Sequence, residues 1–446
     1  MKLPAYVLRA IDRLEKNGFE AYVVGGAVRD ELLGRRPHDY DICTDALVEQ
    51  MTEIFSDFTL VKSGARFGTL RVIINSNSLE ITTYRSDGDY LDHRRPGSVE
   101  FGKSLKEDLA RRDFTINAIA YNPKTGYVDY NNGQADLQSR VVRCVGEPSK
   151  RFSEDALRIL RAVRFAAKLE FTVDARTEIA ALDNKELLKN LSAERVRDEL
   201  SGFIVCKNAG VLLLRYRELF FQIIPELAPC DGFDQHNPNH NHDVLGHIAE
   251  TVNRIGPELV LRLAALLHDI GKPPCFTMDN GRGRFFGHME VSAEMARGIM
   301  TRLHYSAKLI DTVCILVENH DKPYYNTPQS ARRWLNRMGS KNVLYLVKLK
   351  KADCLAHDPS YHNRLYRIAS FRRAVTEALQ RNDCYSLSRL AVGGRDINSA
   401  LGLEPGRYTG EILEHLLNLI IEGEADNNKQ ELMALAKEYN EKEGKK

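Results

Sequence analysis

Two acidic residues near the N-terminus, Asp39 and Asp41, follow a glycine turn and have the spacing of a metal-binding pair. A β-branched run at 22–24 leads into two glycines that end with Gly26, and a segment suited to a helix follows. That order presents backbone N–H groups and a helix N-terminus to an anion, and Arg29 can fork onto phosphate oxygens. The two aspartates alternate along an expected strand, so their carboxylates face the same way. Such a pair suits magnesium and two-metal phosphoryl chemistry.

A third carboxylate, Glu80, lies in the second strand of an expected hairpin. The runs 71–74 and 79–84 have strand character, and the polar segment 75–78 separates them, which is typical of a hairpin. Glu80 shares a strand face with Thr82 because alternate side chains of a strand point the same way. From a neighbouring strand it would complete a metal-binding triad. The alternative is an acid that faces solvent on an edge strand.

Two adjacent arginines, Arg111 and Arg112, lie in a segment, 105–118, whose pattern favours a helix. Guanidinium groups donate paired hydrogen bonds to phosphate oxygens, so both arginines are candidates for binding a triphosphate. The alternative is an ordinary solvated helix face.

Asp155 and Arg158 are three residues apart in a second helical segment, so their side chains are expected to be neighbours. Asp155 accepts hydrogen bonds and Arg158 donates them. Cytosine and adenine present an amino donor beside a ring-nitrogen acceptor, which fits this pair, whereas uracil and guanine present the reverse. A mismatched edge would leave buried polar groups unpaired, at about 1–3 kcal/mol per group. The alternative is a simple ion pair worth a few tenths of a kcal/mol.

Three arginines, Arg158, Arg161 and Arg164, form a stripe at spacing three on the same helix. No acidic residue follows Asp155 within this stretch. We therefore expect the guanidinium groups to be free for phosphate and to contribute to nucleotide binding.

Histidine and aspartate residues recur through the second half of the chain in the order H…HD…H…H…D. The His–Asp dipeptide ends a mainly apolar run, 261–267, and His236, His240 and His242 precede the set, with His242 able to replace or assist its first member. Imidazole together with carboxylate suits a transition metal that activates water for attack on a phosphoester. The set resembles the HD-domain metal-dependent phosphohydrolases. Its members are His247, His268, Asp269, His288, His320 and Asp353.

Composition limits the classes of protein to consider. The 446 residues are 43% hydrophobic and 28% charged, as in globular proteins, and no run of eighteen apolar residues or signal peptide is present. The eight cysteines show no CxxC spacing, which indicates reduced thiols and a cytoplasmic location. The net charge of +2 means that any nucleic-acid site depends on local clusters of cations.

The periodicity of apolar residues divides the chain into an α/β head and a long helical remainder. Helical spacing dominates from residue 152 onward, and no comparable strand pattern follows residue 142. The turn-rich segment 229–239 is the best internal boundary. We expect a catalytic head at 1–145, an all-α neck and body at 146–235, an HD-type helical domain at 236–365 and a helical tail at 366–446.

The motifs of the first half resemble the tRNA nucleotidyltransferase and poly(A) polymerase family. The matching stretches are GGxVRD…DxD at 25–41, RRDFTxNA at 111–118, EDxxR at 154–158 and SAER at 192–195. Together they look like the bacterial-type, class II CCA-adding enzymes, which add C, C and A to tRNA 3′ ends from CTP and ATP, with magnesium and without a template. The resemblance implies a polymerase-β-like mixed sheet, and tRNA rather than DNA or a membrane as partner. It assigns the metal to Asp39, Asp41 and Glu80, the triphosphate to Gly26, Arg29 and Arg112, and the base to Asp155 and Arg158.

Two alternatives to this activity stay open. Bacterial poly(A) polymerases share the head but carry G-[RK]-RF after the DxD pair, whereas residues 63–69 are nearer the G-x-x-x-GT of CCA enzymes, with Phe67 where many have histidine. Residues 87–96 match a DGxYxDxRRP loop, which favours full CCA or A addition over addition of C alone. The second alternative is mainly an HD phosphohydrolase with a vestigial head, which the intact head motifs disfavour.

Overall fold

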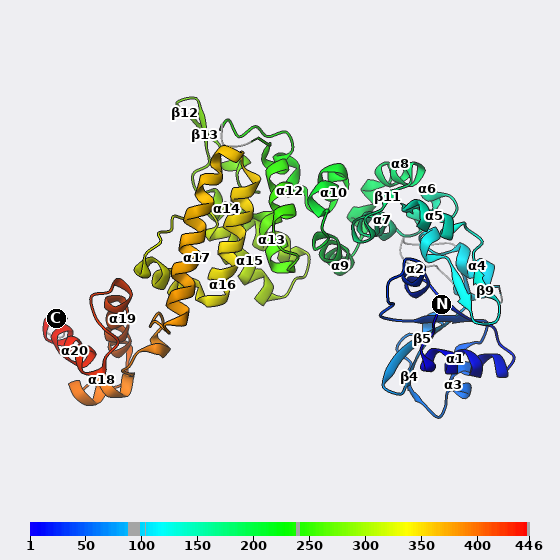
Figure 1. Cartoon of the computed structure of the whole chain (residues 1–446), viewed down its shortest axis with the longest axis horizontal. Helices are drawn as coiled ribbons and strands as arrows, with labels where there is room; N and C mark the ends of the chain where they lie inside the picture. The colour runs from blue at the N-terminus through cyan, green and yellow to red at the C-terminus, as the bar shows by residue number, and fades with distance from the viewer. Residues whose placement is uncertain (88–98, 103, 238–240, 444–446) are drawn as a thin grey trace. The chain divides into compact units, whose positions relative to one another are not determined.

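A computed structural model of the chain describes residues 1–87, 99–102, 104–237 and 241–443 (Figure 1). It contains two compact units, residues 1–225 and 226–446, which divide just before the predicted boundary segment 229–239. The loop predicted at 87–96 lies outside the described residues from residue 88 onward, as does His240. No helix in the described part of the chain combines the length and apolarity needed to cross a membrane.

A seven-stranded mixed sheet forms the head, as the sequence predicted. The amphipathic helix α1 (Ala5–Lys16) precedes it and buries Val7, Ile11 and Leu14. Strands β2 and β5 run parallel, and the other described neighbours in this sheet are antiparallel. In spatial order the strands are β3 (Thr59–Val61), β4 (Thr69–Ile74), β5 (Asn77–Thr83), β2 (Asp41–Thr44), β1 (Ala21–Val24), β8 (Ala120–Asn122) and β9 (Gly126–Val128).

The predicted hairpin is confirmed, with a tighter turn than expected. Strands β4 and β5 pair antiparallel from Ile74 opposite Asn77. Only Asn75 and Ser76 remain between the strands, and both have positive φ, 48° and 64°. A two-residue turn of this kind matches the right-handed twist of the strands. The turn therefore fixes the register that sets Arg71 directly opposite Glu80.

The helix expected over 105–118 is shorter than predicted. Helix α4 spans only Leu105–Ala110, and a 3-10 turn follows at Thr115–Asn117. Phe114 forms a β-bridge with Cys144, and the amide of Thr115 donates to the carbonyl of Arg143. These backbone bonds to a distant segment draw residues 113–115 out of the helix.

Helices make up most of the remainder of the first unit. Helix α7 packs against α9 and buries Ile159, Val163 and Ala166 on its inner side. A two-residue strand, β11 (Thr172–Val173), pairs with β10 (Val141–Val142), so a short strand does follow residue 142. The helices are α6 (Pro148–Glu154), α7 (Leu157–Leu169), α8 (Ala175–Asp183), α9 (Ala193–Ile204), α10 (Ala209–Arg215) and α11 (Arg217–Ile223).

The second unit is a helical bundle with one small hairpin, β12 (Thr277–Asp279) and β13 (Arg282–Arg284). In Figure 1, α16 and α17 run side by side, and they pack together. A separate apolar core begins at Cys384 and joins Ile397, Leu416 and Leu432. The bundle helices are α12 (Val244–Arg254), α13 (Leu259–Leu267), α14 (His288–Arg302), α15 (Ala307–Asn319), α16 (Pro328–Ala356) and α17 (Arg364–Gln380), and the tail helices are α18 (Gly394–Leu401), α19 (Arg407–Glu422) and α20 (Lys429–Glu443).

Candidate functional sites

The parallel pairing of β2 with β5 brings two of the predicted acids together. Asp41, the first residue of β2, lies directly opposite Glu80 in the register. Asp39 precedes the strand rather than lying in it. Desolvation and then the charge of Glu80 raise the pKa of Asp41, while Arg112 opposes the rise and Asp39 adds to it. Three carboxylates and one guanidinium therefore share an electrostatic environment that favours a cation.

The carboxylate of Glu80 accepts a hydrogen bond of 2.5 Å from Arg71 on β4. The motif analysis did not consider Arg71, although the hairpin register places it opposite Glu80. Among the described residues, Asp39, Asp41 and Glu80 do not form a group whose donor atoms all lie within 4.8 Å of one another.

Two guanidinium groups flank the glycine turn. Gly25 has φ 72° and ψ −131°, a backbone conformation that other residues rarely adopt. A Cβ at Gly25 would lie 3.4 Å from Nη1 of Arg112, and one at Gly26 would lie 3.5 Å from Nη2 of Arg29. The turn, Arg29 and Arg112 thus meet around one small space, as an anion site requires.

Buried partners hold both arginines in place. Arg29 donates to Oδ1 of Asn117 at 2.7 Å. Arg112 and Arg111 both donate to Asp108, at 3.0 and 2.6 Å. Burial would raise the pKa of Asp108, but the two arginines lower it. One carboxylate thus orients two guanidinium groups beside the turn.

The expectation that Asp155 and Arg158 are neighbours on one helix is wrong, and so is the alternative of an ion pair between them. Helix α6 ends at Glu154, and Asp155 is extended, with φ −145° and ψ 101°. Its carboxylate accepts hydrogen bonds of 2.8 and 3.0 Å from Arg195 on α9. Arg158 donates instead to Oε2 of Glu154 at 2.8 Å. The break between the helices removes the spacing on which the prediction depended.

The expectation that Arg158, Arg161 and Arg164 are free of acidic partners is also wrong. Arg161 donates to Oδ2 of Asp113 at 2.6 Å, and Arg164 donates to Glu199 of α9 at 2.5 Å. The acids come from segments distant in the sequence, which a search along one helix does not reveal. The arginines brace the helix against its neighbours.

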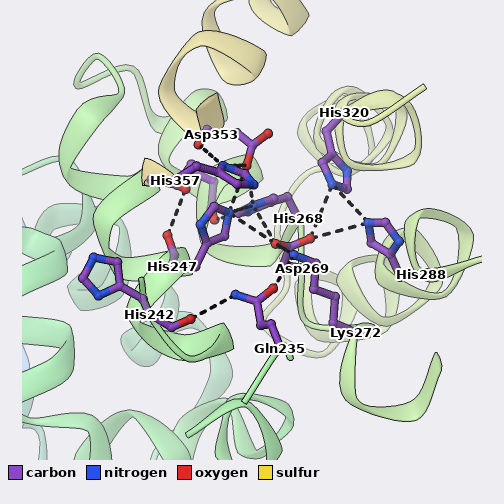
Figure 2. Close-up of polar contacts among 12 residues, drawn as sticks. Gln235, His242, His247, His268, Asp269, Lys272, His288, His320, Asp353 and His357 are labelled. Carbon is purple, nitrogen blue, oxygen red and sulfur yellow. Dashed lines mark hydrogen bonds and ion pairs between the residues drawn. The ribbon is translucent and has the colours of Figure 1, made fainter. Parts of the chain in front are cut away.

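In the second unit, the predicted histidines converge on one buried carboxylate (Figure 2). Oδ2 of Asp269 lies 3.4 Å from Nε2 of His247 and 3.2 Å from Nε2 of His268. Oδ1 lies 3.6 Å from Nε2 of His288 and 3.4 Å from Nε2 of His320. The four imidazoles come from different helices or from their ends.

The same kind of hydrogen bond to a backbone carbonyl orients three of these imidazoles. Nδ1 of His268, His288 and His320 lies 2.8, 2.7 and 2.7 Å from the carbonyl oxygen three residues earlier in the chain. An Nδ1–H that donates there leaves the lone pair of Nε2 directed at Asp269. Metal-binding histidines are commonly fixed in this way.

The donors form three overlapping groups, each within 4.8 Å: His247–Asp353–His357, His247–His268–Asp269 and Asp269–His288–His320. Asp269 and His247 each belong to two groups. His357 was not predicted, yet it follows Asp353 by four residues at the end of α16, a spacing that places both side chains on one helix face. His242 is exposed and lies outside these groups, so the described structure does not support its predicted role.

The electrostatics of this cluster fit a bound cation. Burial lowers the pKa of His247 to about 4, so this imidazole is neutral at pH 7. Burial alone would lower the pKa of His268, but Asp269 raises it. Oδ1 of Asp269 is buried without a hydrogen bond, and its Oδ2 accepts from Lys272 at 2.7 Å. Neutral imidazole and an ionised, unsatisfied carboxylate oxygen are the donor forms that a divalent transition metal takes.

Three family models match separate parts of the chain. The model of the poly A polymerase head domain matches residues 21–143, and that of the HD domain matches residues 242–358. A model described as a probable RNA and SrmB-binding site of polymerase A matches residues 170–231.

The similar curated proteins and the similar solved structure described below are all CCA-adding enzymes. The CCA-adding enzyme of Geobacillus stearothermophilus is 32% identical over 438 residues, which cover 97% of this chain and 96% of that protein. The CCA-adding enzyme of Lactobacillus helveticus is 49% identical over 201 residues, 44% of this chain and half of that relative. The crystal structure of the Bacillus stearothermophilus CCA-adding enzyme in complex with CTP superimposes with a TM-score of 0.73 at 28% identity, and the match covers both chains completely.

Proposed function

This chain belongs to the family of CCA-adding enzymes, and from that premise we propose that its first unit adds C, C and A to the 3′ end of tRNA from CTP and ATP. In each step the terminal 3′-oxygen forms a bond to the α-phosphorus, the bond from that phosphorus to the β-phosphate oxygen breaks, and pyrophosphate leaves. The family membership favours this activity over poly(A) synthesis. The eight free cysteines support a cytoplasmic location.

The observation that carries this proposal is the pairing of Asp41 with Glu80 across β2 and β5. With Asp39, these residues would hold magnesium, which when bound supplies positive charge to the attacking hydroxyl and the leaving pyrophosphate. Burial first, and then repulsion from Glu80 and Asp39, raise the pKa of Asp41, and a bound cation would relieve that repulsion. Arg29, beside Gly26, and Arg112, beside Gly25, would contact the triphosphate.

Asp155 and Arg158 are proposed to select the base, although they do not pair with each other. Arg195 holds Asp155, and Glu154 holds Arg158. Asp155 also accepts from the amide of Leu157, and Arg158 also donates to the carbonyls of Arg151 and Arg111, so both groups are held in fixed orientations. Fixed groups discriminate well because a mismatched edge leaves them unsatisfied.

A single incubation tests the transferase. The protein is mixed with magnesium, CTP, ATP and a tRNA that lacks its last three nucleotides, and the products are separated at single-nucleotide resolution. Extension by three nucleotides that depends on both CTP and ATP is expected. A long tail made from ATP alone would indicate a poly(A) polymerase, and no extension would leave hydrolysis in the second unit as the main activity.

A second function is proposed for the second unit, because Asp269 is surrounded by four Nε2 atoms at 3.2–3.6 Å. His247, His268, Asp269, His288, His320 and Asp353, with His357, would hold a divalent transition metal, which when bound supplies an activated water. We propose hydrolysis of a phosphoester such as a 2′,3′-cyclic nucleotide. One P–O bond to the water oxygen forms, one ribose P–O bond breaks, and the departing ribose oxygen takes a proton.

A further inference from the structure

Two cavities open onto the histidine cluster of the second unit. The first, of about 250 Å³, reaches Asp269 and His288, and the second, of about 370 Å³, extends toward α17. His320, Asp353 and Tyr361 line both cavities. The volume of the second cavity lies within the range of roughly 300–1,000 Å³ that is typical of small-ligand sites. The second cavity is therefore placed to hold a part of a substrate that lies beyond the reacting phosphate.

Cations dominate the lining of the second cavity. The ammonium of Lys350 donates to the carbonyls of His320 and Lys322, at 2.5 and 2.9 Å. Lys322 pairs with Glu318 at 3.0 Å. The charged lining residues are Lys322, Lys350, Arg364 and Arg367, with Asp321 and Asp353 as the acids.

The two arginines differ from Lys322, which pairs with Glu318, and from Lys350, which donates to backbone carbonyls. Within the described residues, neither Arg364 nor Arg367 has a carboxylate oxygen within 4.0 Å. Elsewhere in the same unit, arginines of the bundle do pair with acids, as Arg302 does with Glu226 at 2.7 Å. Two guanidinium groups that line one cavity and are not paired with its acids, Asp321 and Asp353, favour an anion there.

Stacked rings fix Arg364 beside the cluster. The ring of Tyr361 stacks on that of His357, with centroids 4.4 Å apart and planes 16° apart. The guanidinium carbon of Arg364 lies 4.1 Å from the Tyr361 centroid. Arg367 follows three residues later on α17, on the same helix face. A guanidinium held in this way loses little side-chain freedom when it binds a ligand.

We propose that Arg364 and Arg367 form a subsite for a second phosphate of the substrate hydrolysed at the histidine cluster. This inference rests on the proposed phosphohydrolase function of that cluster. The preferred substrate would be a nucleotide whose ribose carries the reacting phosphate at its 2′,3′ end and another phosphate on its 5′ side. A 5′-phosphorylated mononucleotide and an oligonucleotide end both offer this chemistry.

The test compares three substrates with the full-length protein and manganese, nickel or cobalt. They are adenosine 2′,3′-cyclic phosphate, the same compound with a 5′-phosphate, and a dinucleotide that ends in a 2′,3′-cyclic phosphate. The two substrates with a second phosphate are expected to show a KM about 10- to 100-fold lower, the contribution of charge-assisted hydrogen bonds. A larger gain for the mononucleotide would identify a terminal phosphate, and a larger gain for the dinucleotide would identify an RNA end.

Paired variants on the same helix decide whether the arginines are responsible. Arg364→Ala combined with Arg367→Ala should reduce the preference for a second phosphate to about unity. The matched control, Arg372→Ala with Arg373→Ala, changes two exposed arginines of α17 that line a different cavity and should keep the preference. Hydrolysis of all three substrates with equal KM, or a preference that survives the first pair of changes, would overturn the subsite and leave the hydrolase intact. If no substrate is hydrolysed, both proposals fail.

Discussion

The carboxylate of Asp155 accepts two hydrogen bonds from Arg195, a residue forty positions later in the chain. Asp155 lies in the break between α6 and α7, where it is extended and its carboxylate also accepts from the amide of Leu157 at 3.1 Å. The start of α7 and Arg195 of α9 together fix the direction of this carboxylate. If Asp155 reads the base, Arg195 positions it without contacting the nucleotide.

Weakening this pair should erode the selection of nucleotides. Asp155→Ala is expected to lower the ratio of CTP to UTP incorporation by about tenfold or more, since an unpaired buried polar group costs about 1–3 kcal/mol. Arg195→Ala should lower the same ratio by a smaller factor, because Asp155 remains but loses its orientation. The measurement is kcat/KM for each triphosphate on truncated tRNA. A uniform fall in rate with an unchanged ratio would show that the pair only braces the helices.

Replacement of Asp41 should abolish nucleotide addition. Asp41→Ala removes a carboxylate from the β2 edge while leaving the pairing of β1, β2 and β5 intact. Incorporation below a few per cent of wild type at saturating magnesium is expected, with circular dichroism and tRNA binding preserved. Asp12→Ala, at an exposed acid of α1, is the matched control. Turnover above that level would show that the metal assignment is wrong.

Variants of Glu80 and Arg71 distinguish a role of Glu80 in metal binding from a role in the ion pair alone. If Glu80 serves the metal, Glu80→Gln should raise the magnesium concentration needed for half-maximal addition, whereas Arg71→Ala should leave it unchanged or lower it, because the carboxylate loses its competing partner. A magnesium titration of the addition rate measures both effects. Equal defects in the two variants would mean that the surface pair has only a structural role.

The acid stability of the first unit should depend on Asp113. Burial would raise the pKa of Asp113, but Arg161 and the hydrogen bonds from Asn117 and Phe114 hold it below the ordinary value of 3.8. A lowered folded-state pKa contributes stability above pH 3.8 that is lost as pH falls through the folded value.

At pH 7, Asp113→Asn should therefore lower the unfolding free energy by about 1.5–3 kcal/mol, the contribution of hydrogen bonds to a charged group. Urea midpoints measured from pH 7 to pH 2.5 should converge for the two proteins below pH 3.8. Parallel curves would contradict the assignment.

The two proposed active sites should be lost independently. Asp269→Ala should abolish phosphoester hydrolysis and bound transition metal, measured by elemental analysis without chelator, while addition to tRNA persists. Asp41→Ala should show the opposite pattern. A defect in both activities from either change would indicate a shared structural cause. Metal-free preparations that stay inactive after manganese, nickel or cobalt is added would leave the cluster as a scaffold.

Much of the architecture was predictable because it depends on local patterns. The apolar spacing of α1, the two strands around Asn75 and Ser76, and the helical remainder all follow from periods of two or 3.6 residues. The order of histidines and aspartates also indicated one cluster, and the structure places four of the predicted histidines at Asp269 and Asp353 beside His247. His357 could also have been predicted as a member of the cluster, because it follows Asp353 by four residues at the end of a helix.

The sequence by itself determined which residue types occupy the turn, the DxD strand and the HD motif, and therefore the family. Only the tertiary structure decided which charged groups pair. The observed pairs are Asp155 with Arg195, Arg161 with Asp113 and Glu80 with Arg71. The free energy of an ion pair depends on the distance between the charges in space and on their desolvation. Partners up to 48 residues apart in the chain lie at hydrogen-bond distance, and no helical or strand period reports that proximity.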